Sequence, residues 1–112
     1  MASNNKFTFR LTHLAQQDVE LIIKYITEDL ANQPAAIHFK NKLETAIQEA
    51  CHFPESGLPI HNNFLPNLPI RKKIIGNYIM YYYPDTSANI IYIVRIIYAK
   101  RNLTEILQAL KL

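Results

Sequence analysis

The chain has 112 residues and a net charge of +3, and 49% of its residues are hydrophobic while 19% are charged. This composition is typical of a folded domain and excludes a disordered chain. The single cysteine, Cys51, excludes an internal disulfide and favours a reducing compartment. No apolar run reaches the roughly 20 residues that cross a bilayer, and the first residues lack the pattern of a secretory signal. We therefore expect a single cytoplasmic domain over residues 1–112, with no membrane partner.

Two helices are predicted in the first half of the chain, after a short strand. Residues 7–11 alternate between apolar and polar types, as a strand with one buried face does. Thr12 is suited to cap the helix that follows, in which apolar residues recur every three or four positions up to Leu30. Pro34 suits the first turn of a second helix. The short link between the two predicts an antiparallel helical hairpin.

Strands are predicted in the second half, after a long loop. The loop is marked by Pro54, Gly57, Pro59, Pro66 and Pro69. Residues 71–75, 78–83 and 90–98 have the composition of strands, and the last of these is apolar enough to be buried on both faces. Residues 103–112 carry leucines along one side of a short terminal helix. We expect an α+β fold: an N-terminal strand and a helical hairpin packed on a small, mainly antiparallel sheet of about four strands, with a short C-terminal helix.

Positive charge is concentrated in the second half of the chain. Residues 57–112 carry seven basic and two acidic side chains, whereas residues 1–56 carry five basic and seven acidic ones. This asymmetry favours an anionic partner, although a basic protein of this size also shows such clusters by chance. Arg71, Lys72 and Lys73 equally suit a charged edge strand that discourages aggregation.

Strand alternation assigns the tyrosines and Arg95 to faces of the sheet. On the middle strand, one face is expected to hold Tyr78, Met80 and Tyr82, and the other Ile79, Tyr81 and Tyr83. On the last strand, Arg95 is expected to face with Ile91, Ile93 and Ile97, and Tyr98 with Tyr92, Val94 and Ile96. An arginine in an apolar strand either contacts a partner or pairs with a helix carboxylate such as Asp18 or Glu28. Both alternatives stay open at this point.

The order of several short patterns resembles the RelE/ParE toxins of bacterial toxin–antitoxin pairs. The chain runs Leu11-Thr12-x-x-Ala15-x-x-Asp18 and then Ile23-x-Tyr25-Ile26. Residues 71–81 and 91–102 look like two neighbouring strands of the same family, the second with the basic ending Lys100-Arg101. The likeness covers residues 7–107 and depends on order and spacing together.

The resemblance implies the toxin of a plasmid-stabilisation module, neutralised by an antitoxin whose acidic or amphipathic tail folds on binding. RelE-like toxins cut messenger RNA on the ribosome, and ParE-like toxins inhibit DNA gyrase. RNA cleavage needs a proton acceptor, a proton donor and cations for the developing charge. Ile79 stands where the ribonuclease pattern has arginine, and Leu107 where it has tyrosine. The ParE-like branch, a binding inhibitor that is not an enzyme, is therefore favoured.

The resemblance and the strand pattern together suggest the site residues. A ribonuclease would use Lys72, Lys73, Arg101 and Tyr81. Contacts with antitoxin or target are expected at Arg71, Lys73, Tyr78, Arg95, Tyr98, Lys100 and Arg101. No metal or cofactor is expected, because Cys51, His52 and His61 lack the spacing of ligands. Three functions remain open: a gyrase inhibitor, a ribosome-dependent mRNA endoribonuclease, and a non-toxic antitoxin-binding relic. The sequence also leaves a homo-oligomer open.

Overall fold

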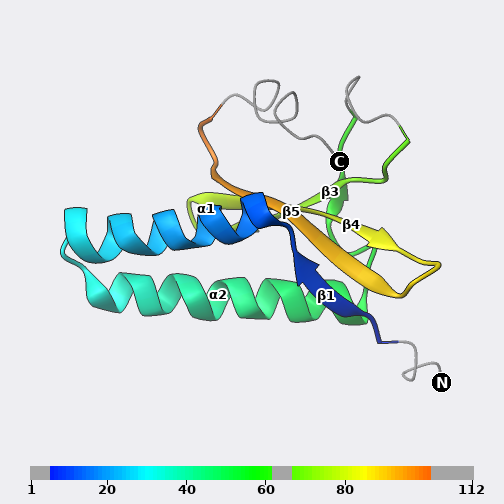
Figure 1. Ribbon diagram of the computed structural model, residues 1–112, viewed down its shortest axis with the longest axis horizontal. Coiled ribbons are helices and arrows are strands. Elements are labelled where there is room, and N and C mark those ends of the chain that lie inside the picture. Colours follow the sequence, from blue (N-terminus) through cyan, green and yellow to red (C-terminus); the bar gives the residue numbers. More distant parts are fainter. Residues whose placement is uncertain (1–5, 62–66, 102–112) are drawn as a thin grey trace.

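Two antiparallel helices cover one face of a five-stranded mixed sheet in the computed structural model of the chain (Figure 1). The structure describes residues 6–61 and 67–101. The elements are β1 (Thr8–Leu11), α1 (His13–Lys24), η2 (Tyr25–Asp29), α2 (Gln33–His52), β2 (Leu58–Pro59), β3 (Arg71–Ile75), β4 (Tyr78–Asp85) and β5 (Ile90–Tyr98). The strand order is β1-β5-β4-β3-β2, with β1 parallel to β5 and the other neighbours antiparallel. The predicted α+β fold is confirmed.

One threonine joins the first helix to β5 of the sheet. Thr12 precedes α1 in an extended conformation, and its Oγ1 accepts a hydrogen bond from the Ala15 amide at 3.1 Å. The same hydroxyl donates to the Val94 carbonyl of β5 at 3.1 Å. The predicted cap is confirmed, and its second bond also fixes where α1 begins on the sheet.

The first helix changes its period before it ends. α1 ends at Lys24, and the next five residues form the π-helix η2, a form that is often found at functional sites. The Thr27 hydroxyl donates to the Ile23 carbonyl at 2.8 Å within this segment. Spacing placed Leu30 on the buried stripe, but the wider π turn rotates the residues that follow it, and Leu30 is 53% exposed. The predicted α-helix up to Leu30 is thus wrong in its last turn.

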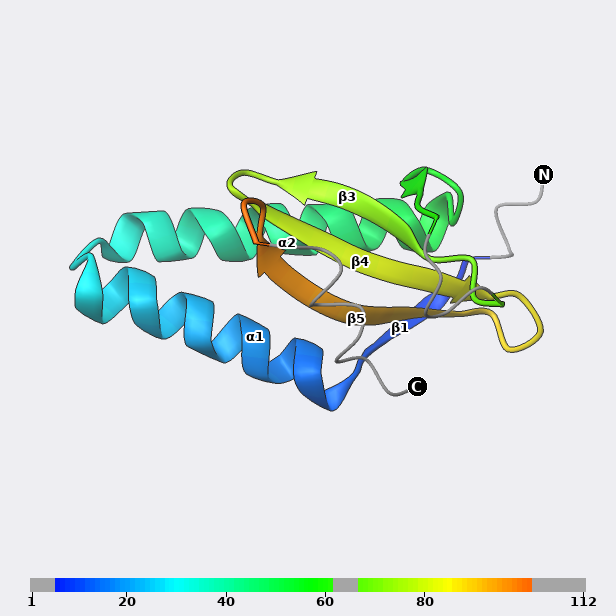
Figure 2. The same ribbon diagram turned by 90° about the horizontal axis from the view of Figure 1, so that it is seen from above.

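The second helix forms as predicted and supplies one wall of the core. The Asn32 side chain caps α2 by accepting a hydrogen bond from the Ala35 amide at 3.1 Å, and Pro34 lies in the first turn. The buried residues of α2 are Ala36, Phe39, Leu43, Ala46, Ile47, Ala50 and Cys51. The helical hairpin extends beyond the ends of the strands, as Figure 2 shows.

The sheet has one strand more than the expected four. Leu58 and Pro59 pair with Lys72 and Arg71 to form β2, inside the segment that was predicted to be a loop. Two residues are too few to show the alternation of a strand in the sequence. β2 is therefore recognised only by its pairing with β3. β4 continues two residues further than expected, to Asp85, because its last residues still pair with the start of β5. The predicted C-terminal helix at 103–112 lies outside the described residues.

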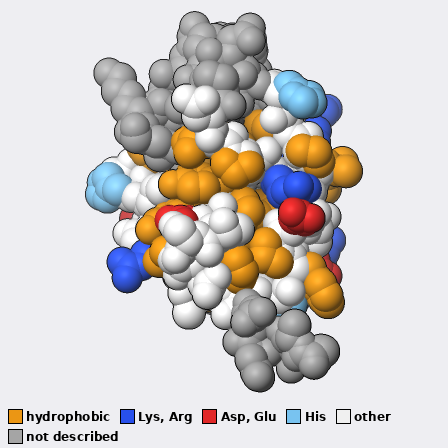
Figure 3. Space-filling model, turned by 90° about the vertical axis from the view of Figure 1, so that its right-hand side faces the viewer, with side chains coloured by type: hydrophobic (Ala, Val, Ile, Leu, Met, Phe, Trp, Pro, Cys, Tyr) orange, Lys and Arg blue, Asp and Glu red, His pale blue; other side chains and the backbone are white. Residues whose placement is uncertain are grey.

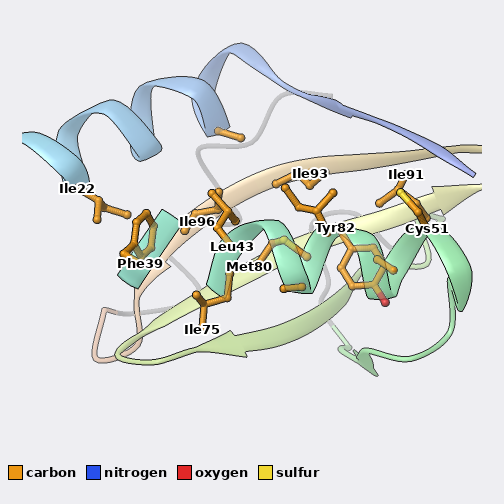
Figure 4. Close-up of a cluster of buried hydrophobic side chains, with 14 of the residues drawn as sticks. Ile22, Phe39, Leu43, Cys51, Ile75, Met80, Tyr82, Ile91, Ile93 and Ile96 are labelled. Carbon is orange, nitrogen blue, oxygen red and sulfur yellow. The ribbon is translucent and has the colours of Figure 1, made fainter. Parts of the chain in front are cut away.

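The main core lies between the helices and the sheet and includes one tyrosine (Figure 4). Tyr82 has no exposed surface, and its hydroxyl donates to the Pro54 carbonyl and accepts from the Gly57 amide, both at 2.8 Å. A Cβ at Gly57 would lie 2.7 Å from the Tyr82 hydroxyl and 2.8 Å from the Lys72 carbonyl. Glycine at this position therefore lets the loop after α2 approach the sheet closely.

A bulge in β5 changes the faces that strict alternation predicts. Tyr81 pairs with Arg95 and Tyr82 with Ile93, so Val94 is an extra residue. Ile96 consequently packs in the helix-side core, while Ile97 joins the cluster on the opposite face. The expected grouping of Ile97 with Ile91 and Ile93, and of Ile96 with Val94, was wrong, because a bulge shifts the alternation beyond it. Arg95 pairs with Tyr81 and likewise does not share the face of Ile91 and Ile93. The expected faces of β4 are confirmed, with Met80 in one cluster and Tyr81 in the other.

Candidate functional site

Arg95 pairs with a helix carboxylate, which decides between its two interpretations. Its Nε and Nη2 atoms donate to the two oxygens of Asp18 at 2.8 and 2.9 Å, and the Ile96 amide donates to Asp18 at 3.0 Å. The hydrogen bonds that Arg95 donates to Asp18 raise the pKa of Arg95, although burial acts in the opposite direction. Both side chains are only 11% exposed. The guanidinium of Arg95 thus joins α1 to β5.

Arg71 and Lys73 are also engaged by neighbouring parts of the fold. Arg71 Nη1 donates to the carbonyls of Glu55 and Gly57 at 3.1 and 2.7 Å, which holds the loop after α2. Lys73 Nζ lies 2.9 Å from Glu49 Oε1 on α2. Alternation places Lys72, between them, on the face away from the helices.

The four candidate ribonuclease residues do not all come together at one place. Lys72 is opposite Tyr81 on the face away from the helices. Tyr81 is 4% exposed in a second cluster with Ile70, Val94 and Ile97, and this burial raises the pKa of its phenol. Lys73 points to α2, as described above. Arg101 follows the end of β5 at Tyr98, and that strand end is three residues, or about 10 Å, along the sheet from Arg95, the partner of Tyr81.

A groove of about 560 Å³ opens between α1 and the ends of β4 and β5. Its lining residues are Asp18, Leu21, Ile22, Tyr25, Leu30, Asn77, Tyr78, Ile96, Ile97, Tyr98 and Arg101. Leu21 and Tyr25 are 65% and 48% exposed, so much of the apolar lining faces solvent. Tyr78 packs edge-on against Tyr98 and against Phe39, with ring centroids 5.9 and 5.3 Å apart.

Backbone hydrogen bonds fix the basic end of this groove. The Ala99 amide donates to the Asn77 carbonyl at 2.8 Å, and the Arg101 amide donates to the Tyr98 carbonyl at 3.0 Å. The turn after β5 is thereby tied to the β3–β4 turn. Asn77 lies in that turn, directly after Gly76 with its φ of +60°.

The structure brings together some of the predicted contact residues and adds others from α1. Tyr78, Tyr98 and Arg101 line the groove, and Lys100 is adjacent in sequence, whereas Arg71, Lys73 and Arg95 lie elsewhere. The predictions did not include Leu21, Tyr25 and Leu30. The one available signal was that Leu21 and Tyr25, four residues apart, form an apolar pair beside the buried stripe of α1.

A second apolar surface lies at the opposite end of the molecule. There a hollow of about 490 Å³ is lined by His52, Phe53, Pro54, Glu55, Ser56, Pro84 and Thr86, and Phe53 is 69% exposed. Figure 3 shows this end, where apolar side chains gather over the middle of the face and most charged side chains lie toward its rim.

The described residues contain neither a metal-binding cluster nor a membrane span. No group of three or more His, Cys, Asp or Glu side chains within residues 6–61 and 67–101 is arranged to hold a metal ion. None of the helices in this part of the chain is both long and apolar enough to cross a bilayer.

Comparison with known proteins identifies the family. Residues 9–103 match the family of the ParE toxin of the type II toxin–antitoxin system parDE. The chain belongs to this toxin family. No curated protein matches its sequence.

Solved structures share the fold at low sequence identity. The RelBE2 toxin–antitoxin complex from Mycobacterium tuberculosis contains a chain that is 21% identical, with a TM-score of 0.58, over 83% of this chain and 98% of that one. A chain of the chromosomal ParDE system from P. aeruginosa is 13% identical, with a TM-score of 0.64, over 86% and 99%. The archaeal RelE–RelB complex from Pyrococcus horikoshii OT3 contains a chain that is 8% identical, with a TM-score of 0.54, over 87% of this chain and 99% of that one. These likenesses show a RelE/ParE-like fold.

Proposed function

We propose that this toxin inhibits growth by binding DNA gyrase and that it does not cleave messenger RNA. One observation carries the proposal: the four candidate ribonuclease residues do not all lie on one surface, although Lys72 and Tyr81 are neighbours. Attack of a 2′-hydroxyl on the adjacent phosphate needs the acid, the base and the cation within hydrogen-bond reach of one phosphate. Lys73 is paired with Glu49 on the helix side, and Arg101 follows the end of β5, where it lines the groove beside α1.

The state of Tyr81 argues in the same direction. A phenol that gives or takes a proton must reach the substrate, but Tyr81 is enclosed by apolar side chains. Burial raises the pKa of Tyr81, so it would be a poor proton acceptor at neutral pH. Ile79, two residues earlier on the same face of β4, has no group for proton transfer.

A cognate antitoxin is the second part of the proposal. Two of the solved structures described above are toxin–antitoxin complexes, and the third is of a ParDE toxin–antitoxin system. The positive balance of residues 57–112 and the exposed apolar groove suit an acidic or amphipathic tail that folds on binding. We infer that such an antitoxin holds the toxin inactive until it is degraded.

Parallel labelling after induction of the toxin alone tests the target. We expect incorporation of labelled thymidine to fall first while leucine incorporation continues, and purified toxin to inhibit supercoiling by gyrase. The paired substitution Lys72→Ala and Tyr81→Phe should leave toxicity unchanged. If leucine incorporation stops first and this variant is harmless, the protein is a ribonuclease and the proposal fails. Absence of any growth defect would instead favour the non-toxic relic.

A further inference from the structure

The apolar surface around Phe53, at the end of the molecule opposite the groove, has the layout of a protein–protein contact. Phe53 directly follows α2 and is 69% exposed, with its ring centroid 6.4 Å from that of His52. Apolar side chains gather over the middle of this face, and most charged side chains lie toward its rim (Figure 3). An apolar centre within a polar rim is the arrangement that protein–protein interfaces have.

The same surface carries both a projecting ring and a space that can receive one. The hollow of about 490 Å³ lies between the residues that follow α2 and the end of β4, where Pro84 and Thr86 line it. This space is larger than one phenylalanine side chain. When two such surfaces meet about a two-fold axis, Phe53 of each copy faces the hollow of the other. One surface therefore supplies both halves of the contact.

Both signs of charge occur around the hollow. Glu55 lines it, and Asp85 lies between two residues that line it. The guanidinium of Arg71 is fixed beside this loop, because its Nη1 donates to the Glu55 carbonyl at 3.1 Å. Lys6 lies near the end of α2, since burial raises the pKa of the Cys51 thiol and the charge of Lys6 acts to lower it. The two carboxylates are thus matched by two cations.

This balance favours a second copy of the chain over other partners. A strongly acidic or strongly basic partner gains little net attraction from a balanced surface. Two identical balanced surfaces can each present carboxylates to the cations of the other. The groove at the opposite end is less suitable for self-association, because it contains Arg101 and would bring like charges together.

We propose that two copies of the toxin associate through this surface about a two-fold axis, with Phe53 of each copy in the hollow of the other. Lys6 of each copy then lies toward Glu55 of the partner subunit. Because the contact is centred on one aromatic side chain from each copy, we expect a dissociation constant of about 10 µM at low salt. The proposal is independent of the toxin's target, and it leaves the groove beside α1 open in both copies.

Sedimentation velocity of the purified, refolded toxin over a range of concentrations tests the proposal. We expect a reversible equilibrium between monomer and dimer. Phe53→Asp should weaken the dimer by about 100-fold, because the substitution acts twice in a two-fold contact. Ile37→Asp is the matched control: Ile37 is an apolar residue of α2, 55% exposed, that does not line the hollow. It should leave the dissociation constant unchanged, and circular dichroism should show the same fold for both variants.

A charge exchange tests the polar part of the contact. Glu55→Lys and Lys6→Glu should each weaken self-association by about 10-fold at low salt, because each brings like charges together. An equimolar mixture of the two variants should form a dimer about as stable as that of the unmodified toxin, since opposite charges then face each other. Glu44→Lys, the same charge reversal at an exposed position of α2, is the control and should neither weaken self-association nor be rescued by Lys6→Glu.

Three results would overturn the proposal. A toxin that stays monomeric up to about 1 mM does not form the dimer at all. A dimer that Phe53→Asp leaves unchanged uses another surface. If the mixture of charge variants associates no better than either variant alone, the two-fold pairing of Lys6 with Glu55 is wrong. None of these results bears on gyrase inhibition, which the labelling experiment tests separately.

Discussion

Replacing Asp18 with alanine should destabilise the toxin more than any surface change, because three hydrogen bonds depend on this carboxylate. It accepts from Arg95 at 2.8 and 2.9 Å and from the Ile96 amide at 3.0 Å. The substitution leaves a nearly buried guanidinium and a buried amide without an acceptor. Loss of one partner of a buried ion pair costs about 3–5 kcal/mol of the free energy of unfolding. For a domain of this size the melting temperature should fall by roughly 12–20 °C.

A double-mutant cycle separates the pair from the effect of truncation. Arg95→Ala removes the other partner, and the double variant removes both charges. The free energy of unfolding should fall by about 1–3 kcal/mol less in the double variant than the sum of the two single losses. Each single variant leaves one unpaired charge, whereas the double variant leaves none. Arg10→Ala, an exposed arginine on β1, is the control and should change the free energy of unfolding by less than about 0.5 kcal/mol.

Urea and thermal unfolding of the refolded toxin, followed by circular dichroism, measure these differences. The loss in Asp18→Ala should change little between low and high salt, because the pair is largely shielded from solvent. A loss below about 1 kcal/mol, or single effects that simply add, would show that Arg95 is not committed to the fold. Arg95 would then be assigned, as in the other sequence-based interpretation, to contact with a partner.

Three further predictions concern the loop, the helix cap and the exposed ion pair. Gly57→Ala should cost about 1–3 kcal/mol, because the new Cβ would lie 2.8 Å from the Lys72 carbonyl; unchanged unfolding would show that the loop can move away. Thr12→Ala should cost about 1–2 kcal/mol by removing the cap and the bond to Val94, which thermal unfolding detects. Lys73→Ala should cost less than about 1 kcal/mol, since its partner Glu49 is largely exposed; a larger loss in urea unfolding would contradict this.

The sequence predicted the site only where neighbouring residues in the chain also lie together in the fold. Tyr78, Tyr98 and Arg101 were found because adjacent strands carry them toward the same end of the sheet. Leu21 and Tyr25 were missed because their exposure depends on how α1 sits on β5. Arg95 illustrates the opposite case, in which charge and apolar context correctly required a partner. Its partner, 77 positions away, could be offered only as one of two alternatives.

Local patterns determined the order of elements in this chain. Thr12 and Pro34 mark the helix starts, and the apolar runs mark β3, β4 and β5, because capping, proline geometry and strand periodicity act between residues close in sequence. The two-residue β2, the bulge at Val94 and the π turn before Leu30 depended on the tertiary structure. The first two are defined by pairing with a neighbouring strand, β2 with β3 and the bulge with β4. The groove and its lone arginine belong to this second group, because only packing places α1 beside the ends of the strands.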